Sequence, residues 1–230
     1  MAKIQLGPMV GQASGAMGGT VFSRNRYGTY IRRRAHPTVS TTPAALAAKA
    51  RLASVSQAWA GLTDAQREAF RVWAANNPVT DRLGERQVLS GHAAYTGLNS
   101  VLSGIGSSLI TAPPTQDAPA ALTSLSLTYD IGVGGVSLDF TATPLGANER
   151  LEIRACVVDS ESVEYIENYL RLLMYSTAAA ATGIDISTEM AARFGTISVG
   201  QVVHVQAAVV EDQSGLKSGP LRAEATVVST

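Results

Sequence analysis

Several residue types and sequence features are scarce in this chain of 230 residues, and each scarcity excludes a class of protein. Cys156 is the single cysteine, so no intrachain disulfide is possible, which is typical of proteins that assemble in a reducing cytoplasm. The three histidines, His36, His92 and His204, lie in separate segments without metal-ligand spacing. No run approaches the roughly 18 apolar residues of a membrane span, and the N-terminus lacks the apolar stretch of a secretory signal. We therefore expect no disulfide scaffold, no metal site and no membrane segment.

Motifs of catalysis are missing as well. The chain contains no G-x-S-x-G elbow, no P-loop and no G-x-G-x-x-G segment after a strand. The acidic stretch with Asp159, Glu161, Glu164 and Glu167 offers oxygen ligands for calcium, but it lacks EF-hand spacing, so we interpret it as a solvated loop. We predict a non-enzymatic protein with no catalytic residues, no cofactor and no metal.

Acidic residues do not occur before Asp64, whereas the residues before it include eight lysines and arginines. The whole chain has a formal net charge of zero, so the part from Asp64 onward carries a matching excess of eight acids. A basic front and an acidic back can attract each other between copies, which predicts a homo-oligomer, or can bring the front to another acidic surface. The alternative is that the arginines only keep the front solvated.

The basic front contains a segment, Gly15 to Pro37, whose pattern predicts an extended hairpin. Residues typical of strands occupy 20–23 and 29–31. Between them, Asn25 and Gly28 supply the positive φ that a chain reversal requires. Two short strands alone are not stable in water, so we expect this arm to lie on its own body or on a neighbouring chain. The predicted partner-binding residues are Phe22, Arg24, Arg26, Tyr30, Arg32, Arg33 and Arg34.

Three helices are predicted after the arm. The first is expected to begin after Thr42, an N-cap residue that is followed by Pro43. The second is expected to begin at a capping box formed by Thr63 and Gln66. In the third, apolar residues recur at helical spacing, although glycines interrupt them. The predicted spans are 44–60, 64–76 and 90–105.

The fold class we predict is α+β, with a boundary marked by three prolines in residues 112–119. Short alternating runs beyond it predict an antiparallel β-sandwich, with 158–168 as a loop or short helix and 178–194 holding one helical turn. The expected strands are 122–129, 136–142, 151–158, 170–175, 201–210 and 221–228. The expected domains are an extended basic arm (1–39), a small helical domain (40–111), a Pro-rich linker (112–120) and the β-sandwich (121–230).

The succession of strands resembles fibronectin type III and related immunoglobulin-like modules. Most of the resemblance lies in the strand at 201–210 and the Gln-Ser-Gly-Leu-Lys-Ser-Gly-Pro segment after it. The chain departs from that family in lacking the tryptophan of the early strands, and it has Val203 or Val205 where a tyrosine is common. Such modules serve as spacers or binding surfaces, so the resemblance implies an immunoglobulin-like fold and names no chemistry.

A second resemblance covers roughly residues 15–100. Its pattern is Gly15-x-x-Gly18-x-x-Val21-Phe22-Ser23-Arg24-Asn25-Arg26-x-Gly28-x-Tyr30-x-Arg32-x-Arg34-x-x-Pro37, then Arg51…Ser56-x-x-Trp59-x-x-Leu62-Thr63-x-x-Gln66-Arg67-x-Ala69-Phe70. An arm of this kind before a Trp-x-x-Leu-Thr helical pair is similar to small structural proteins of tailed phages and prophages. The resemblance implies a component of the virion, without a position in the particle.

These features lead to one hypothesis and two alternatives. The leading hypothesis is a capsid-associated decoration or auxiliary protein of a tailed bacteriophage, anchored by its arm and helices to the major capsid protein or other virion subunits. The first alternative is a tail or baseplate component whose immunoglobulin-like domain binds a host surface glycan. The second, which we rank last, is a nucleic-acid binder that uses the arm arginines, because the arm offers neither a recognition helix nor a stacking sheet.

Overall fold

The computed structural model describes most of the chain, which separates into two compact units. The first unit comprises residues 1–47 and the second comprises residues 48–230. Four α-helices and several antiparallel sheets are present within the described residues, in agreement with the predicted α+β class. The described residues are 2–3, 13–25, 28–35, 41–80, 84–130, 135–163 and 165–227.

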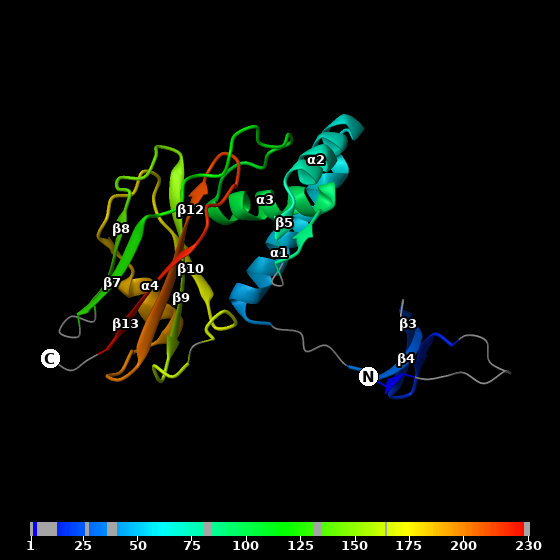
Figure 1. The fold of residues 1–230 in the computed structure, drawn as a ribbon, viewed down its shortest axis with the longest axis horizontal. Helices are drawn as coiled ribbons and strands as arrows, with labels where there is room; N and C mark the ends of the chain where they lie inside the picture. Colours follow the sequence, from blue (N-terminus) through cyan, green and yellow to red (C-terminus); the bar gives the residue numbers. More distant parts are fainter. Residues whose placement is uncertain are drawn as a thin grey trace. The chain divides into compact units, whose positions relative to one another are not determined.

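The arm forms an antiparallel sheet whose strands follow the order β1-β4-β3-β2. Its centre is the predicted hairpin, in which β3 (Thr20–Asn25) pairs with β4 (Gly28–Arg33), as Figure 1 shows. Gly28 has a φ of +114°, the kind of conformation predicted for it at this reversal. Two further short strands, β1 (Ala2–Lys3) and β2 (Gly15–Met17), flank the hairpin. The arm is therefore a sheet of four strands instead of two.

All three predicted helices are present, and each begins within one residue of its predicted start. α1 (Pro43–Ala58) follows Thr42, whose side-chain oxygen accepts a hydrogen bond from the amide of Ala45 at 3.4 Å. α3 (Gly91–Ile105) follows Ser90, whose hydroxyl oxygen accepts a backbone hydrogen bond at 3.1 Å. These side chains satisfy amides that the first turn of a helix leaves without a partner.

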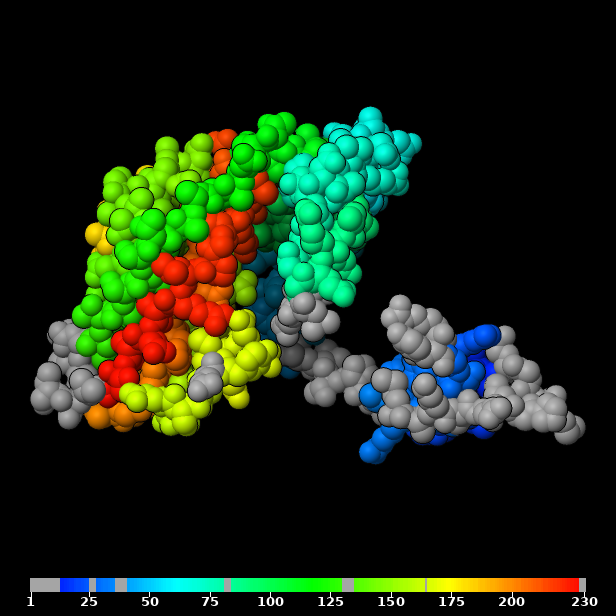
Figure 2. All heavy atoms as spheres, viewed as in Figure 1, coloured from blue at the N-terminus to red at the C-terminus, as the bar shows by residue number. Residues whose placement is uncertain are grey.

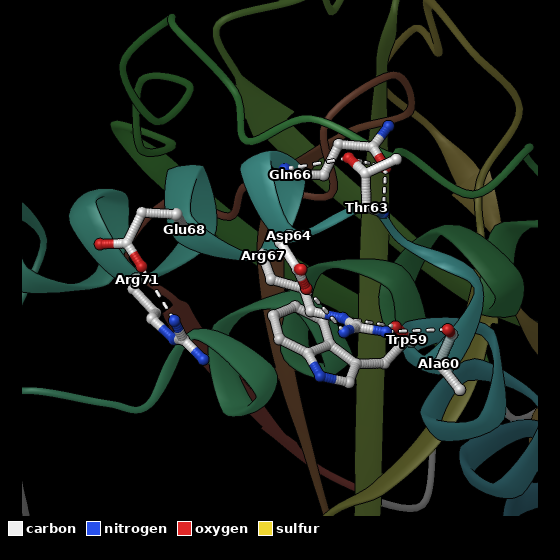
Figure 3. A network of polar contacts seen from close by, with 8 residues as sticks. All are labelled: Trp59, Ala60, Thr63, Asp64, Gln66, Arg67, Glu68 and Arg71. Carbon is white, nitrogen blue, oxygen red and sulfur yellow. Dashed lines mark hydrogen bonds and ion pairs between the residues drawn. The ribbon is translucent and has the colours of Figure 1, made fainter.

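The junction between the first two helices is fixed by short-range hydrogen bonds (Figure 3). A 3₁₀ turn, η1 (Trp59–Gly61), ends α1, and α2 (Asp64–Asn76) begins at the predicted capping box. There Thr63 accepts a hydrogen bond from the amide of Gln66 at 3.3 Å, and the Gln66 side chain accepts one from the amide of Thr63 at 2.9 Å. Arg67 then donates to the carbonyl oxygens of Trp59 and Ala60 at 3.4 and 2.8 Å. The guanidinium group thereby ties α2 to the turn before it.

The three helices share a small apolar core. Phe70 is fully buried, and its ring lies edge-on to that of Tyr95 at a centroid distance of 5.2 Å. Trp59 packs against the same two rings. The segment between α2 and α3 contains a short pair of strands, β5 (Val79–Thr80) and β6 (Arg86–Gln87). The buried core residues of the helices are Val55, Leu62, Phe70, Tyr95 and Leu98.

All six strands predicted after the proline-rich segment are present, and they form two antiparallel sheets. One sheet has the order β10-β9-β12-β13, and the other has the order β11-β8-β7. β13 and β7 lie side by side although they belong to different sheets, as Figures 1 and 2 show. The strands are β7 (Ser124–Asp130), β8 (Gly135–Thr141), β9 (Glu149–Val158), β10 (Arg171–Tyr175), β11 (Ile184–Asp185), β12 (Val202–Glu211) and β13 (Leu221–Thr226).

The two sheets enclose one apolar core. Every second residue of the central strands is buried in it, which is the alternation expected of strands with one face turned inward. The central strands contribute Val136, Leu138 and Phe140 from β8, Leu151, Ile153 and Ala155 from β9, and Val203, Val205, Ala207 and Val209 from β12.

Residues 178–194 differ from the prediction. We expected one helical turn, but the segment holds β11 and the eight-residue helix α4 (Ser187–Phe194). Met190 of this helix is 1% exposed and belongs to the core between the sheets. A helix this short is marginal in water, so its stability comes from packing that the local sequence does not reveal.

Residues 159–163 and 165–170 form the loop rather than the short helix that we also considered. Ile166 and Leu170 of this loop are buried against the outer side of β9 and β12, together with Cys156, Val158 and Val202. The loop therefore covers one end of the outer face of the larger sheet, and Cys156 is buried as predicted.

A turn after β12 connects the two sheets to the helices. Gly215 in this turn lies so close to α3 that an added Cβ atom would stand 2.4 Å from the carbonyl oxygen of Leu98. Leu216 packs against the apolar core of the helices. Gly215 also has a φ of +74°, which side chains other than that of glycine rarely adopt. Close approach and backbone conformation both require glycine at this contact.

Replacing Gly215 by alanine is therefore expected to lower the free energy of unfolding by about 1–3 kcal/mol, because the methyl group overlaps Leu98 and the backbone is strained. Urea denaturation of the full chain, followed by tryptophan fluorescence, measures the change. Gly219→Ala is the matched control, since no atom lies within 4 Å of the position of its Cβ. Equal stability of the two variants would contradict this account of the contact.

Candidate functional site

The arm sheet carries the predicted partner-binding residues. Phe22 and Arg24 lie on β3, and Tyr30 lies on β4. Arg32 and Arg33 end β4, and Arg34 follows it directly, with its amide donating to the carbonyl oxygen of Gly19 at 2.8 Å. Arg26 lies outside the described residues. The arm thus gathers six of the seven predicted residues on one small sheet.

The strand register distributes these residues over two faces. Residues paired across antiparallel strands project to the same side, and successive residues project to opposite sides. Phe22 pairs with Ile31 and Ser23 pairs with Tyr30, so Phe22 and Tyr30 lie on opposite faces. We call these the Phe22 face and the Tyr30 face. The Phe22 face contains Met17, Thr20, Phe22, Arg24, Thr29, Ile31 and Arg33, and the Tyr30 face contains Ala16, Val21, Ser23, Tyr30 and Arg32.

The arm sheet has no core of its own within the described residues. No side chain in 13–24 or 28–35 is buried, and Met17 is 73% exposed. In the second unit, by contrast, residues such as Leu138 and Ile153 are completely buried between two sheets. Because no described side chain of the arm is fully buried, the described part of this sheet lacks the main source of stability for strands, so it fits a segment completed by another surface.

The arginines of the arm are also uncompensated. Among the described residues, no ion pair and no side-chain hydrogen bond involves Arg24, Arg32, Arg33 or Arg34. Several arginines of the second unit are paired instead, such as Arg150, whose Nε lies 3.3 Å from a carboxylate oxygen of Asp212. The guanidinium groups of the arm remain free to bind carboxylates or phosphates of a partner.

A second polar cluster lies in the other unit, around Glu152 of β9. Its carboxylate accepts hydrogen bonds from Lys217, from Nε of Arg154 at 2.8 Å and from the hydroxyl of Tyr175 at 3.1 Å. The Glu152 side chain is only 5% exposed. Sequence reasoning missed this cluster, because Lys217 lies 65 positions away and no local pattern links the two residues.

The protonation states in this cluster follow from burial and charge. Burial alone would raise the pKa of Glu152, but the hydrogen bond with Lys217 and the charges of Lys217 and Arg154 outweigh it and hold that pKa below its ordinary value. Burial, with the negative charge of Glu152, raises the pKa of the Tyr175 phenol. The carboxylate is therefore ionised and saturated with donors, which suits an internal connection and leaves no free base for catalysis.

A polar groove of about 490 Å³ lies over the outer side of β12 and β13. In it, Nδ1 of His204 lies 3.1 Å from a carboxylate oxygen of Glu224, while Nε2 is buried without a hydrogen-bond partner among the described residues. Arg222 pairs with Glu167, and the hydroxyl of Thr226 donates to Glu161 at 2.8 Å. The groove is lined by Glu161, Val163, Ile166, His204, Arg222, Ala223 and Glu224.

Of the remaining predicted features, Cys156 on β9 is the register partner of His204 on β12, whereas His92 lies in α3. His92 contacts Ser56 through Nε2 at 3.2 Å and packs edge-on to Trp59, far in sequence from His204, and His36 lies outside the described residues. Burial raises the pKa of the Cys156 thiol, so this cysteine is a buried apolar residue. Within the part of the chain that the structure describes, no three His, Cys, Asp or Glu side chains are grouped to hold a metal ion.

An apolar groove of about 240 Å³ lies between α2, α3 and the turn at Gly215. Its wall contains Trp73 and Val101, and Lys217 is the only charged residue in the described lining. None of the described helices is both long and apolar enough to cross a lipid bilayer.

Comparison with known proteins returned no relatives. No protein-family description, no curated protein and no solved structure matches this chain.

Replacing Glu152 by glutamine is expected to lower the free energy of unfolding by about 2 kcal/mol at pH 7, because Lys217 and Arg154 lose their counter-charge in a partly buried site. The pKa of Glu152 is lower in the folded than in the unfolded chain, so its stabilising effect is present above about pH 4.3 and is lost as the pH falls through the folded value. The difference between wild type and variant should therefore shrink below about pH 4.

Urea denaturation at a series of pH values measures this difference. Glu68→Gln is the control, because Glu68 forms an exposed ion pair with Arg71, and such pairs contribute about 0–1 kcal/mol. A pH-independent loss in Glu152→Gln would show that the charge of Glu152 is not the cause.

Proposed function

We propose that this chain is a non-enzymatic structural protein of a tailed-bacteriophage virion. In this proposal it is a capsid-associated decoration or auxiliary subunit that binds the major capsid protein or another virion subunit through its arm. It assembles in the host cytoplasm, resides in the virion and is present as several copies.

The arm sheet is the observation on which the proposal depends. Its four strands bury no described side chain, and four of its arginines have no partner in the described chain. A sheet whose described side chains all remain at least partly exposed, and whose edge strands are short, is suited to completing the surface of a neighbouring subunit. Repetition of the arm on many equivalent positions of a particle would add the weak contacts of single copies.

The pattern shared with phage structural proteins supports the same assignment, and the fold gives it a physical meaning. Trp59 and Thr63 of the Trp-x-x-Leu-Thr segment bracket the turn between α1 and α2, and Leu62 between them is buried. Gln66 and Arg67 complete this turn through the capping box and the bonds to the carbonyl oxygens (Figure 3). This part of the pattern is a structural signature of the helical pair, and the arm carries the binding residues.

The order of the strands supports the immunoglobulin-like component of the proposal. With β7, β8 and β11 as strands A, B and E, one sheet reads A-B-E. With β9, β10, β12 and β13 as C, C′, F and G, the other reads C′-C-F-G, as in fibronectin type III modules. α4 is an addition between strands E and F. A module of this type would serve as the part exposed to the surroundings of the particle.

A second candidate function is favoured by the groove over β12 and β13. Its carboxylates and its arginine are groups that hydrogen-bond to sugar hydroxyls. In this alternative the chain is a tail or baseplate component whose immunoglobulin-like module binds a host surface glycan. Nucleic-acid binding ranks third. The arm does form a sheet, but its described arginines do not share one face, because they are divided between the two faces and the end of β4.

Deletion of residues 1–37 is expected to abolish incorporation into particles, because it removes the arm sheet and leaves α1 and the second unit. The chain is co-expressed with the structural proteins of its own gene region, particles are purified on a gradient, and its copy number per particle is measured. Arg71→Gln, which removes an exposed arginine outside the arm, should keep full occupancy. Full occupancy of the truncated chain would refute the anchoring role.

The second candidate makes a separate prediction. If the groove binds glycans, fluorescently labelled full-length chain should adsorb to host cells, and the double substitution Glu161→Gln with Glu224→Gln should reduce adsorption about tenfold by weakening hydrogen bonds to the sugar. Glu68→Gln with Asp64→Asn removes the same charge from exposed positions of α2 and should leave adsorption unchanged. Equal adsorption of both double variants would exclude the groove as the site.

A further inference from the structure

The Phe22 face of the arm combines charge and apolar surface at a regular spacing. The register places Arg24 and Arg33 on neighbouring strands at positions four residues apart. At about 3.4 Å per residue, the two positions are separated by about 13 Å along the sheet. Phe22 and its partner Ile31 lie midway between them, about 7 Å from each arginine position. An apolar centre is thus flanked by one guanidinium group on either side.

The Tyr30 face lacks this arrangement among its described side chains. Arg32 lies opposite Val21 at one end, and the pair formed by Ser23 and Tyr30 follows it. The next residue of β4 on this face is Gly28, which has no side chain. Only the Phe22 face therefore presents two described arginines on either side of apolar residues.

The charge of the Phe22 face limits which kinds of partner can bind it. A second copy of the arm, packed face to face, would set Arg24 and Arg33 against the same arginines, and like charges in close contact are unfavourable. A phosphate backbone would satisfy the arginines but would leave Phe22 and Ile31 against charged, hydrated groups. A protein surface with both acidic and apolar side chains satisfies all parts of the face.

We propose that the Phe22 face binds an extended segment of another virion subunit with the pattern acid-x-apolar-x-acid. Alternate residues of a strand project to one side at intervals of about 7 Å, so this pattern sets two carboxylates about 13 Å apart with an apolar side chain between them. The spacing equals that of Arg24, the Phe22–Ile31 pair and Arg33. The inference rests on the proposed function and adds the chemistry of the partner.

The contacts cooperate physically. Arginine forms bidentate hydrogen bonds with carboxylates, and a partner side chain over Phe22 and Ile31 would exclude water from between the two ion pairs. Ion pairs shielded from water are stronger than exposed ones, so the apolar centre would strengthen both flanking contacts. The Phe22 face would then contribute more to binding than the Tyr30 face.

The experiment compares two double variants of the full chain that carry the same change in charge. Arg24→Glu with Arg33→Glu alters the Phe22 face, and Arg32→Glu with Arg34→Glu alters the Tyr30 face and the residue after β4. Both are co-expressed with the virion proteins, and the copy number per purified particle is measured. We expect the first to lower occupancy about tenfold or more and the second to lower it clearly less, because Arg32 and Arg34 do not lie on either side of the Phe22–Ile31 pair.

A conservative variant tests whether the loss of occupancy is caused by the change of charge or by misfolding of the arm. Arg24→Lys with Arg33→Lys keeps the charges and should retain most of the occupancy that the glutamate variant loses. Equal losses in both glutamate variants, or a loss in neither, would overturn the assignment of the Phe22 face. Deletion of 1–37 separates this result from the proposed function: if the deletion abolishes incorporation while the two glutamate variants behave alike, the anchoring role stands and the inference fails.

Photo-crosslinking identifies the occupant directly. Benzoylphenylalanine replaces Thr20 on the Phe22 face or Ser23 on the Tyr30 face of the full chain within particles. The inference requires the crosslinks from position 20 to outnumber those from position 23 and to fall on a segment of another subunit with the acid-x-apolar-x-acid pattern. Crosslinks to nucleic acid, or only to other copies of this chain, would overturn it.

Discussion

A β-sheet needs a cover for at least one face, and the arm of this chain has none among its described residues. Its strands are short, its edge strands have two and three residues, and the apolar side chains are divided between both faces. Hydrophobic burial is the dominant favourable term in folding, so hydrogen bonds between the strands cannot replace it. The proposed function rests on this constraint: in that proposal, a surface outside the arm supplies the missing burial.

The second unit shows what the arm lacks. Two sheets bury every second residue of their central strands, and the helices add a core of their own that the turn at Gly215 connects to the sheets. Even its buried charge is neutralised, since Glu152 is surrounded by Lys217, Arg154 and the Tyr175 hydroxyl. The second unit thus contains the buried apolar cores that stabilise a fold, whereas the described part of the arm does not.

Local signals predicted much of this structure, and contacts distant in sequence account for what they missed. The capping box of Thr63 and Gln66, the hairpin with Gly28 and the alternation in β12 each depend on residues close in sequence, and all are present. β1 and β2 are too short to show alternation, and α4 depends on burial of Met190 in a distant core. The arginines of the site were evident from composition, but their division between two faces required the register.

Charge also bears on when the arm binds. Between exposed charges, attraction is screened beyond about 8 Å at physiological ionic strength, so the arm arginines act only at near contact. Identical arms repel one another at that range, which disfavours pairing of free arms before a particle surface is present. An acidic surface with an apolar centre reverses the sign of the interaction and covers Phe22 and Ile31 together. The same arginines that keep free copies apart would thus, in the proposed function, select the assembled surface as the place where the arm sheet is covered.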